Sequence, residues 1–294
     1  MFYRRKIALA ILQAFGGELD KMSLQKLLFL FSRQQTEKSF HFVPYKYGCY
    51  SFQANADLGT LTKYKLVEES GSNWKKVDQT NYLNELKVSD RVAIAYIVNH
   101  YSGFSKDDLV KLTYKNYPYY AINSTIAATI LHPDELARVE NQKVHKSATV
   151  LFTIGYEGVS LEEYLNKLIA NGVTVLCDVR RNPFSMKYGF SKSQLQKACI
   201  GVGIDYVHIP EVGIDSDKRQ ELHTQADYDS LFDFYKTTIL AKQVAKQKEI
   251  LNLLLTKKRV ALTCFEANIC QCHRKHLAES IATLPGFHYE VNHI

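Results

Sequence analysis

Short apolar runs alternate with helical patterns through the second half of the chain. Runs of strand length occupy residues 149–154, 173–177, 206–209 and 259–263, and residues 287–291 can add a fifth strand. Between them, leucines recur at the spacing of a helix face, as at positions 161, 165 and 168. Strands that are apolar along their whole length are buried on both faces. The pattern therefore predicts an α/β fold with an open, mostly parallel sheet and helices on both of its faces.

Chemically reactive side chains follow these expected strands. In an open parallel sheet, ligands bind beyond the carboxyl ends of the strands, which meet at one edge. We therefore expect a site at that edge. Its predicted catalytic residues are Asp178, Cys264, Glu266, Cys272 and His273. The predicted anion-binding residues are Arg180, Ser185 and Arg274, and the predicted pocket residues are Gly155, Tyr156 and His208.

Several of these residues also have a structural interpretation. Asp178 and Arg180 are close enough in sequence to form an ion pair within the fold. Cys272 is expected at the start of a helix beside Arg274, an environment that lowers the pKa of a thiol. The sequence therefore predicts Cys264 or Cys272 as a nucleophile or thiolate ligand, and leaves a purely structural role open.

A metal site needs separate consideration. Cys264, Cys270, Cys272 and His273 are residue types that bind zinc. Their spacing contains no pair of Cys-x-x-Cys knuckles, so we disfavour a metal there and leave the cofactor open. The sequence also lacks the glycine-rich dinucleotide fingerprint, the P-loop run and the Gly-x-Ser-x-Gly elbow, which argues against dinucleotide, P-loop and serine-hydrolase chemistry.

The first half shows helical patterns followed by a hairpin. An apolar stripe from Leu24 to Phe31 has helical spacing, and Ser23 just before it is a candidate N-cap. Residues 66–77 form two short strand patterns about Gly71. This order predicts a mainly helical, winged-helix-like domain that precedes the α/β domain.

The basic charge of the chain lies mostly in this first half. Residues 1–146 contain 20 Lys and Arg against 14 Asp and Glu, a net charge of +6, whereas residues 147–294 contain 17 against 16, a net charge of +1. A basic domain favours a polyanionic partner. The lysines near the expected helix end and hairpin are candidates for phosphate contacts, although each also fits a solvated surface. These lysines are Lys63, Lys65, Lys75 and Lys76.

The length of 294 residues favours two domains. We expect the helical recognition or regulatory domain at residues 1–131, a connector at 132–148 and the α/β domain at 149–294. No apolar run approaches the length of a membrane span, and the first residues do not resemble a signal-peptide core. We therefore expect a cytoplasmic protein whose six cysteines are reduced and serve a local purpose.

Two family resemblances follow from motifs in the two halves. Six short motifs, which include Cys177-Asp-Val-Arg180, Cys264-Phe-Glu266 and Cys272-His-Arg274, closely resemble the domain-of-unknown-function family 488 over about residues 149–285. That resemblance implies no particular reaction, and Tyr156 stands where many members have His. It implies that the family's characteristic positions are occupied here by Gly155, Asp178, Arg180, Pro183, Ser185, Cys264, Glu266, Cys272, His273 and Arg274. About residues 5–70 resemble Panacea-type helical domains, which accompany prokaryotic toxin–antitoxin and regulatory modules.

Together these features predict a nucleic-acid- or nucleotide-directed enzyme that performs hydrolysis or group transfer at a phosphate or glycosidic bond. Its expected partners are a nucleic acid and a small anionic or nucleotide ligand, with no membrane, and a homodimer or a partner protein is compatible with the sequence. The alternative is a non-enzymatic transcriptional regulator or antitoxin-like protein whose second domain senses an anion or an oxidant through its thiols. Salt-dependent duplex binding and the reactivity of the thiols distinguish these hypotheses.

Overall fold

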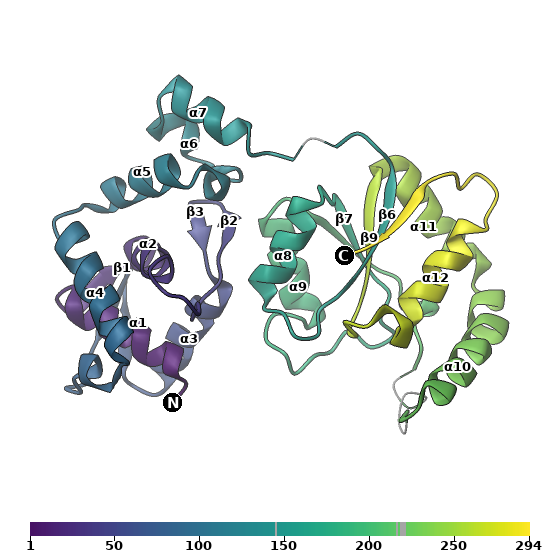
Figure 1. Ribbon diagram of the computed structural model, residues 1–294, viewed down its shortest axis with the longest axis horizontal. Helices are drawn as coiled ribbons and strands as arrows, with labels where there is room; N and C mark the ends of the chain where they lie inside the picture. The colour runs from purple at the N-terminus through teal and green to yellow at the C-terminus, as the bar shows by residue number, and fades with distance from the viewer. Residues whose placement is uncertain (145, 216, 218–221) are drawn as a thin grey trace. The chain divides into compact units, whose positions relative to one another are not determined.

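A computed structural model describes residues 1–144, 146–215, 217 and 222–294 of the chain. It consists of two compact units, which we call unit 1 (Met1–Lys143) and unit 2 (Val144–Ile294) (Figure 1). Among the described residues, no helix has the length and apolar character needed to cross a membrane.

Unit 1 is mainly helical and contains two small antiparallel sheets. Its helices and strands, in chain order, are α1 (Tyr3–Ala14), β1 (Glu18–Asp20), α2 (Lys21–Ser32), β2 (Val43–Tyr45), β3 (Gly48–Tyr50), α3 (Phe52–Lys63), β4 (Val67–Ser70), β5 (Asn73–Lys76), η1 (Tyr82–Glu85), α4 (Val88–Tyr101), α5 (Lys106–Asn116), η2 (Pro118–Ala121), α6 (Ala127–Ile130) and α7 (Pro133–Glu140). The order β1-β5-β4 makes one sheet, and the β2–β3 hairpin makes the other.

The core of unit 1 lies around α1 and α2. The apolar stripe from Leu24 to Phe31 is buried, which confirms its predicted role as core. The predicted cap at Ser23 is wrong by three residues. Asp20 is the N-cap of α2, because its carboxylate accepts hydrogen bonds from the amides of both Met22 and Ser23.

Helix α7 lies within the residues expected to form a connector, and it belongs to unit 1. Pro133 is its first residue, a position where the missing amide proton costs nothing. Glu135 accepts a hydrogen bond from the amide of His132 and pairs with Lys115 of α5 at 2.6 Å. These contacts and the buried Val139 attach α7 to unit 1.

Unit 2 has the alternating pattern that the sequence predicts. Its elements are β6 (Val150–Gly155), α8 (Leu161–Ala170), β7 (Val175–Asp178), α9 (Lys192–Gly201), β8 (Asp205–His208), η3 (Pro210–Val212), α10 (Gln225–Phe234), η5 (Tyr235–Leu240), α11 (Val244–Lys257), β9 (Arg259–Cys264), η6 (Ile269–Gln271), α12 (His273–Ala282) and β10 (Glu290–His293). The segment η5 is a π-helix that follows α10 directly and precedes α11, so residues 225–257 do not form one continuous α-helix.

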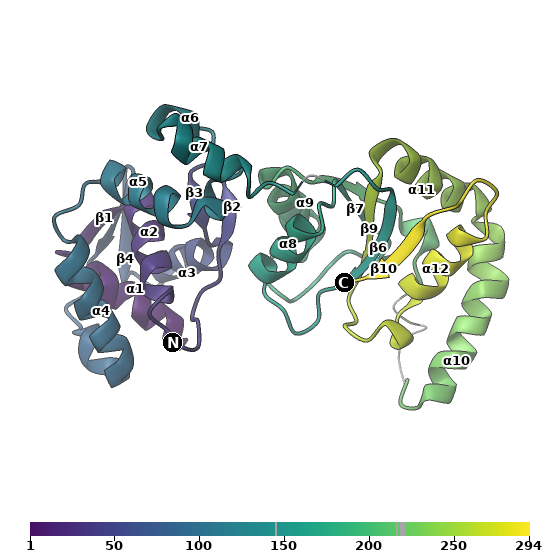
Figure 2. The same cartoon turned by 45° about the horizontal axis from the view of Figure 1, so that its top comes forward.

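The sheet of unit 2 has five strands in the order β10-β6-β9-β7-β8, and every neighbouring pair is parallel. Helices α8 and α9 cover one face, and α11 and α12 cover the other (Figures 1 and 2). This arrangement confirms the predicted open α/β sheet. The chain moves from β6 toward β8 on one side and returns through β9 to β10 on the other, so the direction of winding changes beside β6 and β9. Such a switch point is where open α/β sheets bind ligands.

Candidate functional site

A cavity of about 300 Å³ lies at the carboxyl edge of this sheet. Its walls come from the residues that follow β6, β7 and β9 and from the start of α12, as the strand-end argument predicts. Predicted site residues that line it are Tyr156, Arg180, Ser185, Cys264 and His273. The other predicted site residues are not part of its described wall; they are Gly155, Asp178, His208, Glu266, Cys272 and Arg274.

Asp178 forms a buried ion pair with Arg180, which lines the cavity. The Nε atom of Arg180 donates to Oδ1 of Asp178 at 2.8 Å, and its NH2 atom donates to Oδ2 at 2.5 Å. The hydroxyl of Tyr206 on β8 donates to the same Oδ2 at 2.6 Å. Arg180 also donates from NH1 to the hydroxyl of Tyr156 and to the carbonyl of Phe190. This geometry favours the structural ion-pair interpretation of Asp178 over a catalytic one.

Cys264, the last residue of β9, has two acceptors close to its sulfur. The Oε2 atom of Glu266 lies 3.2 Å from Sγ, and the Nδ1 atom of His273 lies 3.5 Å from it. The other ring nitrogen of His273, Nε2, lies 3.2 Å from the carbonyl oxygen of Val179. A carbonyl only accepts hydrogen bonds, so Nε2 carries a proton and Nδ1 of a neutral ring presents a lone pair to the thiol. The cysteine and the histidine are both buried.

Cys272 differs from its sequence-based expectation. It is fully buried as the N-cap of α12, and burial raises the pKa of its thiol well above the usual value. The hydrogen bond and charge of Cys264 and the charge of Glu266 raise this pKa further, whereas Arg274 lowers it by the smallest contribution. The helix start and the arginine were expected to activate this thiol, but desolvation outweighs them. Cys264 is equally buried, but it lines the cavity and contacts His273, so it is the better candidate nucleophile.

Arg274 is not part of the described cavity wall, and its guanidinium instead donates hydrogen bonds to backbone carbonyls. Its NH1 atom donates to the carbonyl of Glu266 at 2.5 Å, and its NH2 atom donates to the carbonyl of Ala267 at 3.3 Å. The side chain is buried, and its Nε has no partner among the described residues. These contacts fix the loop after β9, which carries Glu266 and directly follows Cys264.

Ser185, His208 and Gly155 have different contacts near the cavity. Ser185 lines it, and the Oγ of Ser185 accepts a hydrogen bond from the amide of Lys187. The Nε2 atom of His208 lies 3.0 Å from the carbonyl oxygen of Arg180, which it supports from β8. A Cβ atom at Gly155 would lie 2.0 Å from the carbonyl oxygen of Glu266, so glycine is required for the close approach of β6 to this loop.

Three donor atoms at the site are arranged so that a metal ion is conceivable. The sulfurs of Cys264 and Cys272 and a ring nitrogen of His273 all lie within 4.8 Å of one another. Two thiolates and an imidazole suit zinc, and a fourth position would be taken by a carboxylate or water. Cys270 is exposed and lies outside this group, so the four-residue set considered from the sequence is not assembled in the described part of the chain.

The sequence analysis did not select the apolar rim of the cavity. Phe184, Met186 and Phe265 line the cavity, and their exposed fractions are 72%, 97% and 42%. Large apolar side chains that remain exposed around a cavity are a common sign of a binding surface. Phe265 lies inside the motif Cys264-Phe-Glu266, but an apolar residue in a motif is normally assigned to the core, so this exposure could not be predicted from the sequence.

The predicted lysines of unit 1 differ in their surroundings. Lys63 at the end of α3 and Lys65 just after the helix are both exposed. Lys75 is exposed on β5, with its Nζ atom 3.4 Å from a carboxylate oxygen of Glu68. The side chain of Lys76 is only 8% exposed, and it pairs with Asp78 at 3.2 Å. Lys63 and Lys65 are therefore the two that are best placed to contact phosphate.

Comparison with known proteins bears on unit 2. No curated protein matches the chain. One family model does match a part of it, and the matched segment contains β7, β8, β9 and most of α12, with Asp178, Cys264 and His273 among its residues. Residues 160–281 match the family described as "Domain of unknown function DUF488", which supports the resemblance of the C-terminal half to that family.

Proposed function

We propose that unit 2 is a cysteine-dependent enzyme in which Cys264 is the nucleophile and His273 is its general base. The observation that carries this proposal is the 3.5 Å approach of Cys264 Sγ to His273 Nδ1 in the wall of the strand-edge cavity. The contact of Nε2 with the Val179 carbonyl fixes the ring so that its basic nitrogen faces the thiol. Positioning of a base by a third group is the arrangement found in nucleophile–base pairs.

The proposed reaction begins with transfer of the thiol proton of Cys264 to Nδ1 of His273. The thiolate then attacks the electrophilic phosphorus or anomeric carbon of the substrate, and the bond to the leaving group breaks with its electron pair. The leaving group takes a proton from the imidazolium, which restores His273 as a neutral base. Water, activated by the same base, displaces the enzyme sulfur in a hydrolase, and a second acceptor does so in a transferase.

The rim of the cavity supports a substrate with a flat apolar part, such as a nucleobase. Phe184, Met186 and Phe265 offer apolar surface around the cavity entrance. The guanidinium of Arg180 is already engaged by Asp178, so we assign contact with an anionic group to Arg181. Arg181 also lines the cavity, and its contact with Asp215 is half exposed and easily exchanged. Hydrolysis or group transfer on a nucleotide combines these features.

The first experiment measures modification of the native protein by methyl methanethiosulfonate, followed by mass spectrometry across a range of pH. We expect Cys264, which lines the cavity, to react faster at neutral pH than Cys177 and Cys199, whose pKa values burial raises. His273→Asn should slow the reaction of Cys264 and leave the exposed Cys270 unchanged. A native Cys264 that is inert, or equally reactive in His273→Asn, would contradict the proposed pair.

Two further measurements complete this test. Ribonucleoside 5′-phosphates are incubated with the protein, and released phosphate and free base are separated by chromatography. Cys264→Ser should abolish any release that the native protein shows, whereas Cys270→Ser should retain it. The purified protein is also analysed for zinc. If it contains one zinc ion per chain and Cys272→Ser loses that ion, Cys264 is a metal ligand and not a nucleophile.

A second proposal concerns unit 1, which we propose to be a nucleic-acid-binding domain of winged-helix type. The order of α1, β1, α2, α3 and the β4–β5 hairpin supports it, as does the pairing of β1 with β5. The exposed Lys63 ends α3, and the exposed Lys65 follows it, so both lie close to this hairpin in sequence. Unit 1 would then deliver the enzyme to a nucleic acid. The alternative, a regulator without catalysis, would share this binding and lack a reactive Cys264.

A further inference from the structure

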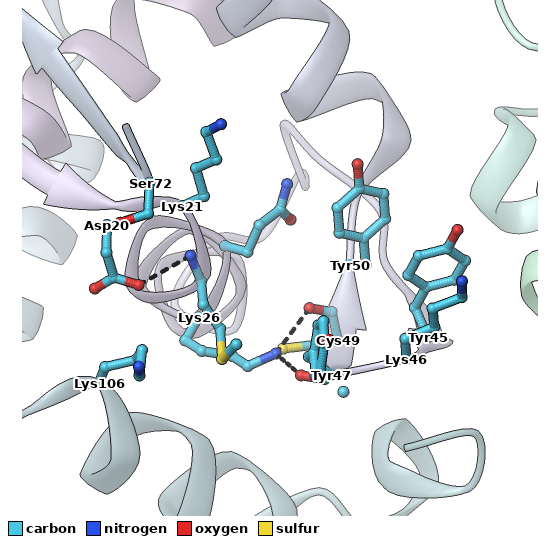
Figure 3. A pocket seen from close by; sticks show the side chains of 13 residues that line it. Asp20, Lys21, Lys26, Tyr45, Lys46, Tyr47, Cys49, Tyr50, Ser72 and Lys106 are labelled. Carbon is cyan, nitrogen blue, oxygen red and sulfur yellow. Dashed lines mark hydrogen bonds between the residues drawn. The ribbon is translucent and has the colours of Figure 1, made fainter. Parts of the chain in front are cut away.

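Unit 1 has a cavity of its own, of about 420 Å³, between the start of α2 and the β2–β3 hairpin (Figure 3). This volume lies within the range of small-molecule sites, roughly 300–1,000 Å³. Three tyrosines and a methionine provide much of its wall: Tyr45, Tyr47, Tyr50 and Met22. The rings of Tyr45 and Tyr50 stack with their centroids 4.9 Å apart. The wall therefore offers flat apolar surface with a few polar groups.

A buried ammonium group lines this cavity. Lys26 of α2 is 1% exposed, and its Nζ donates to the carbonyl oxygens of Tyr47 at 2.5 Å and of Cys49 at 3.1 Å (Figure 3). No described carboxylate pairs with it. Burial lowers the pKa of Lys26, and the side chain of Cys49 acts in the opposite direction without outweighing this desolvation. A buried cation of this kind is stabilised by an anion that enters the cavity.

Other positive charges surround the same space. Lys21, Lys46 and Lys106 line it, and Lys46 and Lys106 are exposed with no side-chain partner among the described residues. Lys21 pairs with Glu69. The one carboxylate in the wall as described belongs to Asp20, which already accepts the two amide hydrogen bonds at the start of α2. The charge of the wall is therefore unbalanced in favour of an anionic occupant.

We propose that this cavity binds a small organic anion, in which a flat apolar body lies against the tyrosines and a carboxylate or phosphate group meets the lysines. Lys26 supplies a buried ammonium and Lys46 and Lys106 supply charge at the rim. The occupant is a small molecule rather than a nucleic-acid backbone, because the central cation lies inside a cavity with aromatic walls instead of on an exposed surface.

Lys26 also has a structural task that any test must separate from binding. Its two carbonyl partners belong to the β2–β3 hairpin, and its neighbour Gln25 exchanges hydrogen bonds with the backbone of Ser51. Both side chains thus tie α2 to the hairpin. The two carbonyls and the side chain of Cys49 provide partners for the ammonium of Lys26, but this task does not account for Lys46 and Lys106 at the rim.

The experiment uses three compounds with one ring system: 2-naphthoate, 2-naphthyl phosphate and the uncharged 2-naphthamide. Binding to the full chain is measured by isothermal titration calorimetry at neutral pH. We expect the anions to bind this cavity, in addition to any binding at the Arg181 site proposed for unit 2, and an affinity at least about tenfold lower for the amide, the ratio expected when a charge-assisted hydrogen bond is lost. Failure of both anions to bind, or equal affinity for the amide, would overturn the proposal.

Matched variants locate the site. K46Q/K106Q should weaken binding of the anions by about two- to fivefold, as expected for partly exposed charges, and leave the amide unchanged. K63Q/K65Q removes the same charge outside the cavity and should leave all three compounds unchanged. Equal weakening by both pairs would mean that the anions sense only net charge, which contradicts the proposal.

Lys26→Met is the more severe variant, and we expect it to reduce anion affinity by more than the rim pair does. Circular dichroism shows whether its hairpin still folds, and K46Q/K106Q remains decisive if it does not. The competing assignment is tested with a short DNA duplex. Duplex binding that depends on Lys46 and Lys106 and is not displaced by 2-naphthoate would assign these lysines to nucleic acid and overturn the proposal.

Discussion

Asp178 and Arg180 are both buried, and each satisfies the hydrogen-bonding groups of the other. A third contact comes from Tyr206, whose hydroxyl donates to the carboxylate from the neighbouring strand. Two charges out of water are stable only while they remain paired, because a single buried charge keeps its full desolvation cost. The carboxylate therefore holds the end of β7 and orients Arg180, which in turn supports Tyr156 in the cavity wall.

Loss of the Asp178 carboxylate should lower the stability of the folded protein. We expect Asp178→Asn to lower the free energy of unfolding by about 3–5 kcal/mol, because the guanidinium of Arg180 is left buried without its partner. Urea denaturation followed by circular dichroism measures this. The control is Arg181→Gln, which removes a half-exposed ion pair with Asp215 and should change stability by less than about 1 kcal/mol. A stable Asp178→Asn protein with no turnover would make Asp178 catalytic.

At the scale of elements, the site depends on how closely β6 approaches the loop after β9. Gly155 ends β6, and the amides of Tyr156 and Glu157 both donate to the carbonyl of Phe265 in that loop. The carboxylate of Glu157 also accepts from the amide of Ala267. These bonds, with the contacts of Arg274, set the position of the Cys264 and Glu266 side chains relative to α12.

Adding a methyl group at Gly155 should disturb this junction. We expect Gly155→Ala to destabilise the protein by about 1–3 kcal/mol, since the new Cβ would overlap the carbonyl of Glu266. It should also change the rate of Cys264 modification, because the loop must move. Thermal unfolding and mass spectrometry measure the two effects. Gly59→Ala in α3 has open space and should be neutral or stabilising. Unchanged stability and reactivity in Gly155→Ala would show that the loop adapts without cost.

Much of unit 2 could be predicted because its signals are local. Apolar runs gave β6, β7 and β9, and the strand-end rule brought Cys264, Tyr156 and Arg180 to one cavity. Their partners could not be predicted, because the contact of Cys264 with His273 depends on where α12 begins relative to β9. The activation expected for Cys272 was wrong for the same reason: burial of a thiol is a property of packing, which the residues around it in sequence do not reveal.

The interrupted helix is another limit of local patterns. Residues 225–257 contain apolar positions that fit helical spacing, yet α10 passes into a π-helix before α11. In the π-helix Tyr235 is buried, and its hydroxyl donates to the carbonyl of Val212. A local sequence pattern does not predict a hydrogen bond between residues that are this far apart in the chain. In unit 1 the capping residue was misplaced because Ser23 and Asp20 both have the required chemistry, and only the backbone geometry decides between them.

At the scale of the whole molecule, the division of charge matches the division into units. The basic excess lies in the first half, where the proposed nucleic-acid surface and the lysine-lined cavity both occur. The second half is nearly neutral, and the arginines of its site are used mainly within the fold. Recognition and chemistry are therefore proposed to be separate properties of the two units.

Salt dependence tests the recognition part of this proposal. We expect the full chain to bind a short DNA duplex at low salt, measured by fluorescence anisotropy, with an affinity that falls steeply as salt rises. K63Q/K65Q should reduce the slope of log affinity against log salt by about 1 for each phosphate contact that is lost. Lys257→Gln, an exposed lysine of unit 2, is the control. Absence of binding at low salt, or equal effects of both variants, would refute the assignment to Lys63 and Lys65.

The position of β10 has a consequence for the order of assembly during synthesis. This strand pairs with β6, and Thr153 contacts His293 across 140 residues of sequence. While a ribosome is still making the intervening chain, β6 presents an unpaired edge that can associate with other nascent chains. Unit 1 has its own core and needs none of those residues. Unit 1 is thus able to fold first, and the α/β unit completes its sheet only after residue 293 has emerged.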